Sequence, residues 1–484
     1  MIASFHNEDQ KKKSGLKKYL KQLLMKPGFV TNRQTNGYLY INIINPHRYI
    51  FYTSKFPAFL LALASIIIMQ SACKQRAPEI EWEKSFGGSQ LDEAACIKQT
   101  SDSGYIVAGK GGSLDGDETG NHGFTDFWII KLDQKGNLVW QKAYGGTYYD
   151  EAQDIQQTAE GGYIVAGGTY SSNGDVKGHH QRGDAWIIKL DAIGNLEWQK
   201  QVGGRDHDFA YSVQQAKDGG YVVAGVTDSK DGVFKNNHGG QDVWIFKLDE
   251  NGNFLWQKLF GGSGIDGSYD IQQTKDGGFV VACSIGLKDD GKGNSREKMD
   301  SWIIKLDEKG NLQWQKTYGG SDYDIANSIY QTSDGGYIGA VVSESKDGDI
   351  SGNHGYSDYW IIKLDDNGNL QWKKSAGGNL SDIAYSVLQT TDDGFVIAGY
   401  TSSVEGDISK NHGLQDYWII KLNGKGKLQW EKSLGGSGND WAYSILQSAD
   451  GGYVIAGKSD SKDGDVTGNH GDDDYWIVKL KPEK

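Results

Sequence analysis

The stretch Asp358-Tyr-Trp-Ile-Ile-Lys-Leu-Asp-Asp-Asn-Gly-Asn-Leu-Gln-Trp372-Lys-Lys occurs in six full versions along the chain, without insertion or deletion, and its two halves occur once more at the two ends of the repeat region. An apolar, β-prone run, a turn with glycine and a second short run predict two strands joined by a tight turn. This pair of strands is the unit around which we interpret the rest of the sequence.

The repeat has a fixed length of 58 residues. The second tryptophan of the stretch recurs at this step, at Trp82, Trp140, Trp198, Trp256, Trp314, Trp372 and Trp430. The first does the same, at Trp128, Trp186, Trp244, Trp302, Trp360, Trp418 and Trp476. A fixed period of this order is typical of a solenoid, a propeller or an array. Seven units over residues 79–484 suit a propeller, because each blade buries its faces against its neighbours.

Each unit predicts four strands, which in the fifth unit are Ala326–Thr332, Tyr337–Val342, Asp358–Leu364 and Leu370–Lys374. Glycine turns join the first strand to the second and the third to the fourth, and a long polar loop joins the second to the third. Four-residue turns are too short to carry the chain from one blade to the next. The crossing is therefore either the Gly-Gly-Ser-x-x-Asp link or the long loop, and we choose the link, which makes the strand after it innermost. That strand carries the small residues suited to a crowded centre, Ala94, Ala152, Ala210, Ala326, Ala384 and Ala442.

Closure of the ring follows from the two ends of the repeat region. It begins with a lone strand of the fourth type, Glu79–Ser85, and ends with one of the third type, Tyr475–Leu480. We expect the first to complete the seventh blade, which removes open sheet edges. The sequence therefore predicts an all-β fold, a seven-bladed β-propeller of four-stranded repeats over residues 79–484.

Strand direction predicts two different faces of the disc. Because neighbouring strands alternate in direction, both glycine turns of a unit fall on one face, here called the turn face. The Gly-Gly links and the long loops fall on the other, here called the loop face. Recognition usually resides on variable loops held by a rigid scaffold, so we expect the binding site on the loop face, over the central channel.

Residues 1–73 have a different character. Lysines precede an 11-residue apolar run, 59–69, which is short for a membrane span and is followed by Gln-Ser-Ala-Cys73. This is the layout of a secretory signal. Ser71-Ala72-Cys73 resembles the lipobox of bacterial lipoproteins, which implies a lipid on Cys73 and a short linker over 74–78. Gln70 departs from the usual aliphatic residue, and the positive region is long. An uncleaved anchor or a start codon placed too far upstream would explain the length, and an exported protein with an incidental Cys73 is the alternative.

The composition limits the kinds of partner that we expect. The net charge of −13 argues against nucleic acid. Cys96 and Cys283 occupy different positions of the first and fourth units, so we expect two buried thiols and no bridge.

The segment Tyr318–Tyr337 resembles the β-propeller repeat of many bacterial exported and surface proteins. Asp307–Trp314 resembles the tryptophan-bearing turn of quinoprotein-type propellers, a group with both outer-membrane scaffold lipoproteins and quinone-dependent dehydrogenases. The likeness covers all seven units and implies the fold. It leaves the activity open, because propellers host many functions.

The long loop gathers the candidate binding residues. It repeats an Asp-Gly-Asp pattern and a histidine, replaced by Arg296 in the fourth unit. The candidates are Asp115, Asp117, His122, Asp347, Asp349, His354, Asp407, His412, Asp463, Asp465 and His470. Trp441, the one tryptophan outside the repeat pattern, joins them as a residue that could be exposed. Asp463, Asp465 and Asn469 also form a possible oxygen-ligand set for Ca²⁺. The alternative is a hydrogen-bonded loop in which each histidine binds a nearby carboxylate.

Other residues recur in every unit and are interpreted as structural. The fourteen repeated tryptophans are expected to pack between blades. Two aspartate series are expected to bind loop N–H groups: Asp92, Asp150, Asp208, Asp266, Asp324, Asp382 and Asp440 in the links, and Asp126, Asp184, Asp242, Asp300, Asp358, Asp416 and Asp474 before the first tryptophan.

These patterns favour a non-catalytic binding or scaffolding module of a bacterial cell envelope. We expect an exported, lipid-anchored monomer without a resident cofactor, which binds an envelope protein or a glycan. The alternative is an envelope enzyme, polysaccharide-cleaving or quinone-dependent, that uses the acidic loop face. No unit contains a nucleophile motif, a phosphate loop or a Cys/His metal cluster.

Overall fold

The computed structural model describes residues 29–35, 38–45, 48–52, 75–178, 182–287 and 298–483. The chain divides into two compact units, Met1–Gln75 and Arg76–Lys484. Cys73, His180 and Arg296 lie outside the described residues. A search of the described residues finds no helix long and apolar enough to cross a membrane.

The first unit contains a three-stranded antiparallel sheet that the sequence analysis did not anticipate. Its strands follow one another in chain order, β1 (Phe29–Thr35), β2 (Tyr38–Asn45) and β3 (Arg48–Tyr52).

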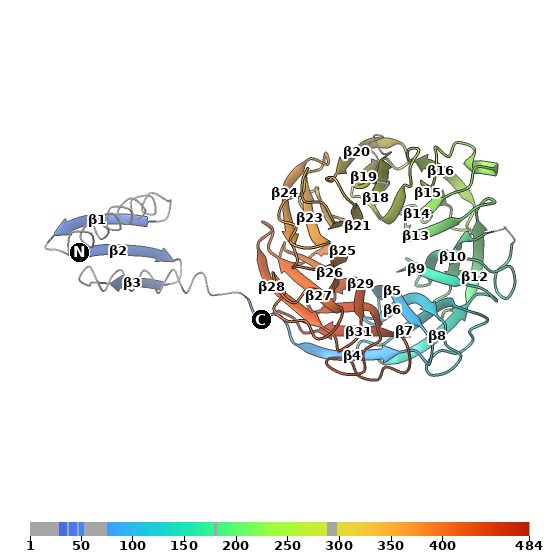
Figure 1. The fold of residues 1–484 in the computed structure, drawn as a ribbon, viewed down its shortest axis with the longest axis horizontal. Coiled ribbons are helices and arrows are strands. Elements are labelled where there is room, and N and C mark those ends of the chain that lie inside the picture. Colours follow the sequence, from blue (N-terminus) through green and yellow to red (C-terminus); the bar gives the residue numbers. More distant parts are fainter. Residues whose placement is uncertain are drawn as a thin grey trace, which may run out of the picture. The chain divides into compact units, whose positions relative to one another are not determined.

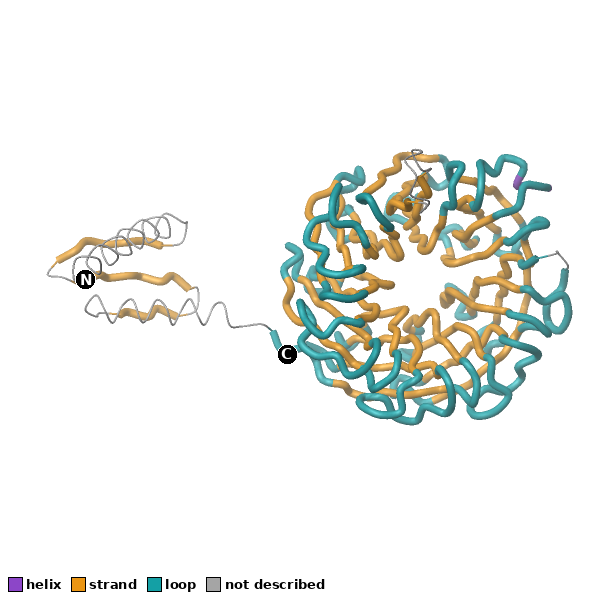
Figure 2. Tube along the Cα trace, in the orientation of Figure 1, coloured by secondary structure: helices purple, strands orange, loops and turns teal. Residues whose placement is uncertain are grey.

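The second unit is a seven-bladed β-propeller of four-stranded antiparallel sheets (Figures 1 and 2). The innermost strands are β5 (Asp92–Gln99), β9 (Asp150–Gln157), β13 (Asp208–Gln215), β17 (Gly267–Gln273), β21 (Asp324–Gln331), β25 (Asp382–Gln389) and β29 (Asp440–Gln447). The second strands are β6 (Tyr105–Gly111), β10 (Tyr163–Thr169), β14 (Tyr221–Thr227), β18 (Phe279–Leu287), β22 (Tyr337–Ser343), β26 (Phe395–Thr401) and β30 (Tyr453–Ser459). The third strands are β7 (Asp126–Leu132), β11 (Asp184–Leu190), β15 (Asp242–Leu248), β19 (Lys298–Leu306), β23 (Asp358–Leu364), β27 (Asp416–Leu422) and β31 (Asp474–Leu480). The outermost strands are β4 (Ile80–Phe86), β8 (Leu138–Tyr144), β12 (Leu196–Val202), β16 (Phe254–Phe260), β20 (Leu312–Tyr318), β24 (Leu370–Ala376) and β28 (Leu428–Leu434). A short 3₁₀ turn, η1 (Gly232–Phe234), lies in the third unit's long loop.

The predicted order of strands and the predicted closure are both confirmed. The strand after each Gly-Gly link is innermost, and its small residues, such as Ala94 and Ala442, are buried. The seventh blade has the order β29-β30-β31-β4, so the N-terminal strand of the propeller pairs with the C-terminal one. Trp476 lies opposite Ser85, and Lys479 lies opposite Trp82.

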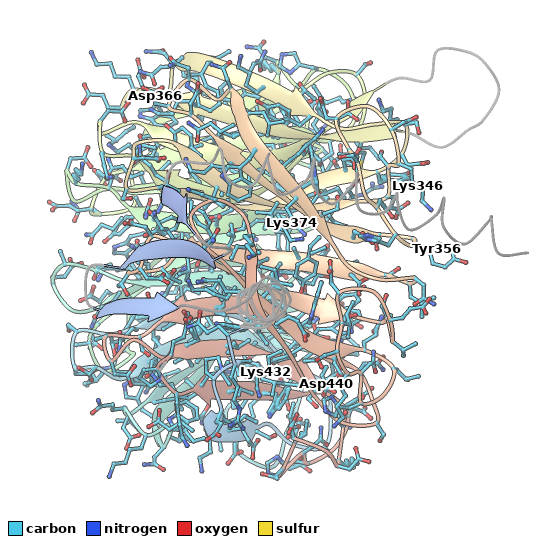
Figure 3. All side chains as sticks on the ribbon, turned by 90° about the vertical axis from the view of Figure 1, so that its left-hand side faces the viewer. Lys346, Tyr356, Asp366, Lys374, Lys432 and Asp440 are labelled. Atoms are coloured by element: carbon cyan, nitrogen blue, oxygen red, sulfur yellow. The ribbon has the colours of Figure 1, made fainter. Side chains whose placement is uncertain are left out.

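The two faces of the disc are also as predicted. Seen from the side, Asp366 in a glycine turn lies at one face, and Lys346 and Tyr356 in a long loop lie at the opposite face (Figure 3). The loop face is therefore the face of the links and long loops.

The repeated tryptophans pack between blades. Trp128 of blade 1 is fully buried and its ring lies 4.5 Å from that of Tyr475 in blade 7, whose hydroxyl donates to the Trp128 carbonyl at 2.9 Å. Trp82 of blade 7 covers the glycine turn of blade 1, where Gly136 has φ +77° and a Cβ would meet the indole at 2.9 Å. A side chain at this turn is excluded by both the backbone and the tryptophan.

A buried lysine in each third strand is a repeated feature that the sequence analysis missed. Lys363 in β23 is buried, donates to its neighbour's carbonyl at 3.0 Å and lies 3.0 Å from Asp334 in a turn of the same blade. Equivalent pairs in other blades hold the turn face together.

Candidate functional site

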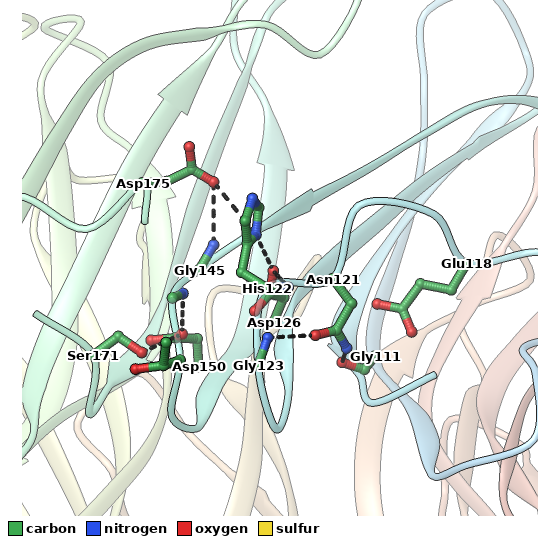
Figure 4. A network of polar contacts seen from close by, with 12 residues as sticks. Gly111, Glu118, Asn121, His122, Gly123, Asp126, Gly145, Asp150, Ser171 and Asp175 are labelled. Atoms are coloured by element: carbon green, nitrogen blue, oxygen red, sulfur yellow. Dashed lines mark hydrogen bonds and ion pairs between the residues drawn. The ribbon is translucent and has the colours of Figure 1, made fainter. Parts of the chain in front are cut away.

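The link aspartates organise the boundary between consecutive blades (Figure 4). Asp150 Oδ2 accepts from the Gly146 N–H at 2.7 Å and from the Ser171 hydroxyl at 2.8 Å, and the Thr169 hydroxyl donates to Oδ1. Asp382 and Asp440 make corresponding contacts. The expectation that these carboxylates satisfy loop N–H groups is confirmed.

The loop histidines are engaged by the second aspartate series. The Nδ1 atom of His122 lies 2.6 Å from Asp126 Oδ2, which also accepts the His122 N–H at 3.0 Å (Figure 4). The same pairs recur at His238–Asp242, His354–Asp358, His412–Asp416 and His470–Asp474. Burial raises the pKa of Asp126 to about 6. The hydrogen-bonded alternative for the loop therefore describes its histidines correctly.

The Asp-Gly-Asp pattern folds each long loop onto the link before it. Asp347 Oδ1 accepts the Ser321 N–H at 2.8 Å, and Asp115 and Asp463 accept link N–H groups in the same way. Farther along, the N–H groups of Asp117, Asp349, Asp407 and Asp465 donate to link carbonyls. His122 Nδ1 approaches Asp175 of the next blade at 3.9 Å. The structure thus groups the loop candidates by blade boundary.

Two of the three possible Ca²⁺ ligands, Asp463 and Asn469, accept hydrogen bonds from backbone N–H groups. Asp463 Oδ1 accepts the Ser437 N–H at 2.7 Å, and Asn469 Oδ1 accepts the Gly471 N–H at 3.1 Å. Over the described ranges, no group of three or more His, Cys, Asp or Glu side chains is arranged to hold a metal ion.

The central channel is lined by the inner strands and has two cavities. The one toward the loop face has a volume of about 360 Å³, and the one toward the turn face about 330 Å³. A ring of side chains borders both: Ala95, Gln153, Tyr211, Tyr269, Asn327, Tyr385 and Tyr443. Four tyrosines, two amides and one alanine make this ring asymmetric, unlike the blade boundaries.

A charged cluster lies at the loop-face mouth of the channel, where blades 7, 1 and 2 meet. We call it the mouth cluster, and it consists of Glu93, Lys110, Glu151, Lys458 and Asp473. Lys458 lies 2.6 Å from Glu93 and 3.0 Å from Asp473. Lys110 lies 3.0 Å from Glu93 and 3.7 Å from Glu151. Burial raises the pKa of Glu93, but the two lysines outweigh it, so the pKa is lowered overall.

Trp441 lies beside the mouth cluster, but it does not present a free ring. Its indole stacks on Tyr400 at 5.0 Å, Lys458 Nζ lies 4.3 Å from the ring, and the indole N–H donates to Gln415 at 2.6 Å. The side chain is half-buried. Trp441 therefore packs against Lys458 of the mouth cluster.

Sequence analysis missed the mouth cluster, although a signal was present. The second strands carry lysine only at Lys110 and Lys458, where the other units have Gly168, Val226, Ser284, Val342 and Tyr400. A comparison of units for their differences would have selected both lysines.

Comparisons with known proteins agree with the fold. No protein-family model matches the chain. The regulatory protein FlaEY of Caulobacter vibrioides is 27% identical over 208 residues, which are 39% of this chain and only 21% of FlaEY. An ulvan lyase of polysaccharide lyase family PL25, solved with -[GlcA(1-4)Rha3S]-, has a TM-score of 0.50 at 12% identity and covers 82% of this chain and 96% of its own. The chain is a seven-bladed β-propeller. The WD40 domain of Neurospora crassa Pan2 has a TM-score of 0.45 at 11% identity, covering 81% of this chain and 90% of that domain. Identities this low speak for the fold alone.

Proposed function

We propose that the propeller is a non-catalytic binding module that captures its partner at the loop-face mouth of the central channel. The observation that carries this proposal is the mouth cluster. Similar contacts recur at the boundaries between the seven blades and hold the ring together. A site for one partner needs residues that occur in one part of the ring and are not repeated in every blade. Glu93, Lys110 and Lys458 do so, in the position where rigid scaffolds commonly place recognition.

Glu93, the carboxylate between the two mouth lysines, favours binding over catalysis, whereas burial raises the pKa of Asp473. Glycan cleavage needs a general acid or base whose pKa lies near the working pH. The lowered pKa of Glu93 keeps it ionised between its lysines, and burial raises the pKa of Tyr211 to about 12. These groups are suited to fixed electrostatic contacts with a partner.

The predicted loop residues have an indirect part in this proposal. Asp115, His122, Asp347 and their equivalents set the shape of the blade boundaries around the mouth. The location in a bacterial envelope and the lipid on Cys73 belong to the same proposal and rest on the signal-like segment before the propeller.

The test is a capture experiment with charge-neutral variants. The mouth variant Glu93→Gln, Lys110→Gln, Glu151→Gln, Lys458→Gln, Asp473→Asn removes all five mouth charges together, so that no partner charge is left buried alone. The matched control neutralises exposed turn-face charges, with Lys309→Gln and Asp366→Asn. We expect the control to capture an envelope component as well as the wild-type protein does. The mouth variant should capture at least tenfold less of it.

Two results would contradict the proposal. One is capture that depends on the turn-face charges and not on the mouth cluster. The other is release of soluble fragments from envelope polysaccharide by the wild-type protein but not by the mouth variant, which would establish the enzymatic alternative.

A further inference from the structure

A separate recess lies on the loop face of blade 2, beside the link that enters this blade. It has a volume of about 470 Å³, and its wall includes Tyr148, Tyr149, Tyr170, Ser172 and Arg182. We call it the tyrosine pocket. Its wall shares no residue with the channel cavity toward the loop face, so the tyrosine pocket is distinct from the mouth cluster.

The pocket is marked by large aromatic side chains that remain open to solvent. Tyr148, Tyr149 and Tyr170 are 54%, 48% and 43% exposed, and the neighbouring Phe124 is 58% exposed. Phe124 stacks on Tyr149 with centroids 5.1 Å apart and ring planes 11° apart. Contiguous exposed aromatic surface is unusual on a soluble domain and typically marks an interaction site.

Two rings of this surface, Tyr148 and Tyr170, occur in one unit only, whereas the fifth unit has Tyr323 at the position of Tyr149. The position of Tyr170 is occupied in the other units by Gly112, Asp228, Gly286, Glu344, Ser402 and Asp460. The position of Tyr148 is occupied by Gln90, Asp206, Gly264, Asp322, Leu380 and Gly438. Since the other six units fold without a ring at the positions of Tyr148 and Tyr170, folding of a blade does not require these two side chains.

The shape of the surface favours a chain of small rings over a folded protein. Protein interfaces of standard size bury about 800 Å² on each partner and need an extended surface, whereas a concave pocket with a few polar groups takes a smaller ligand. Here the side chains of Tyr148, Tyr149 and Tyr170 line the same recess as Ser172, so that aromatic rings and hydroxyl groups lie together. Stacking on an aromatic face combined with hydrogen bonds at its edge suits sugar rings, which have an apolar face and a polar rim.

Charge indicates which kind of glycan the pocket takes. The Arg182 guanidinium lies 3.4 Å from Asp206, so its charge is already offset. The chain as a whole carries a charge of −13, which disfavours a polyanion. We propose that the tyrosine pocket binds a short stretch of an uncharged glycan, stacked on Tyr149 and Tyr170. This inference goes beyond the proposed capture of a partner at the mouth.

The test is affinity electrophoresis of the full chain in gels that contain one polysaccharide each. The uncharged probes are laminarin, xyloglucan and galactomannan, and the anionic ones are alginate and hyaluronate. The test variant is Tyr149→Ala with Tyr170→Ala, and the matched control is Tyr356→Ala, which removes a 72% exposed tyrosine from the same face of blade 5. Melting temperatures verify that the variants fold.

We expect at least one uncharged polysaccharide to retard the wild-type protein, and the control and the mouth variant to bind it equally well. The double variant should lose at least tenfold in apparent affinity. The inference is overturned if no uncharged probe retards the wild-type protein, if only anionic probes do, or if the double variant binds as wild type does. Loss of partner capture in the double variant without loss of glycan binding would also overturn it, by assigning the pocket to a protein interface.

Discussion

In blade 1, Gly111 and Glu118 together replace a pair of residues, Thr169 and Val176, that stand at the same positions in blade 2. The effect of this double replacement on stability can be tested directly. In blade 2, the Thr169 hydroxyl accepts the Ser171 N–H at 3.0 Å and donates to Asp150. Blade 1 has Gly111 at the threonine position, and the carboxyl of Glu118 fills the space. Glu118 Oε2 accepts the Ser113 N–H at 2.7 Å, as the threonine does in blade 2. At the place of Glu118, other units have Val176, Phe234, Ile350, Ile408 and Val466.

The perturbation is the pair of substitutions Gly111→Thr and Glu118→Val, made singly and together. A Cβ at Gly111 would lie 2.4 Å from Glu118 Oε1, so the threonine alone clashes. The valine alone leaves the Ser113 N–H buried without its acceptor, which costs about 1–3 kcal/mol. Together they rebuild the arrangement of blade 2. We expect the double variant to fall within ~1 kcal/mol of wild type and a coupling energy of about 2 kcal/mol.

The assay is urea unfolding of the four proteins at pH 7, repeated between pH 5 and 9. Burial, followed by the neighbouring Asp92, raises the pKa of Glu118 to about 9 from its ordinary 4.5. A raised pKa means that the folded chain binds the proton more tightly, so stability declines as the pH rises between these values. This decline should be weaker in the double variant. Additive single effects, or an unchanged pH profile, would refute the reasoning.

Three further predictions follow from the fold. Deletion of β4, Ile80–Phe86, exposes the edge of β31, and we expect a large loss of thermal stability or aggregation, measured by differential scanning fluorimetry and light scattering; a deletion variant that melts like wild type would contradict the closure. Burial raises the pKa of Asp382, Asp440 and Asp474 to about 6, above the ordinary 3.8, so the folded chain holds these protons more tightly and the melting temperature should be higher at pH 5 than at pH 7; the opposite order would contradict this. Chelation with EDTA should leave the melting temperature unchanged, since backbone groups engage Asp463 and Asn469; a drop that Ca²⁺ reverses would restore the Ca²⁺ alternative.

The architecture was predictable because it depends on local rules applied seven times. The fixed step between Trp82 and Trp140 gives the unit. The four-residue turns leave the Gly-Gly link and the long loop as possible crossings between blades, and the alanines after the link, such as Ala94, favour the link. The unpaired strand near Ile80 can then only complete the seventh blade, where the fourth strand is missing. The buried lysines were missed because Lys363 sits in an apolar run, where the sequence does not show that Asp334 reaches it.

The mouth cluster was beyond this reasoning for a geometric reason. Glu93 and Lys458 are 365 residues apart and meet only because the ring closes. The sequence analysis concentrated on residues that recur, such as His122 and Asp347, and recurrence identifies what every blade needs. Residues that distinguish one blade from another, such as Lys110 and Tyr170, are found when equivalent positions of the seven units are compared for their differences.

Closure by β4 has a consequence for biosynthesis. Glu83 in β4 accepts a hydrogen bond at 3.0 Å from the indole of Trp476, which follows it by 393 residues. At a synthesis rate of about 5–20 residues per second, this partner emerges from the ribosome roughly 20–80 s after β4 does. During that interval β4 lacks its own partner, β31, and a third strand from another blade or another nascent chain would fit nearly as well, because all seven third strands are similar in sequence. Delivery of the chain to a compartment where it is dilute would protect this waiting strand until the ring can close.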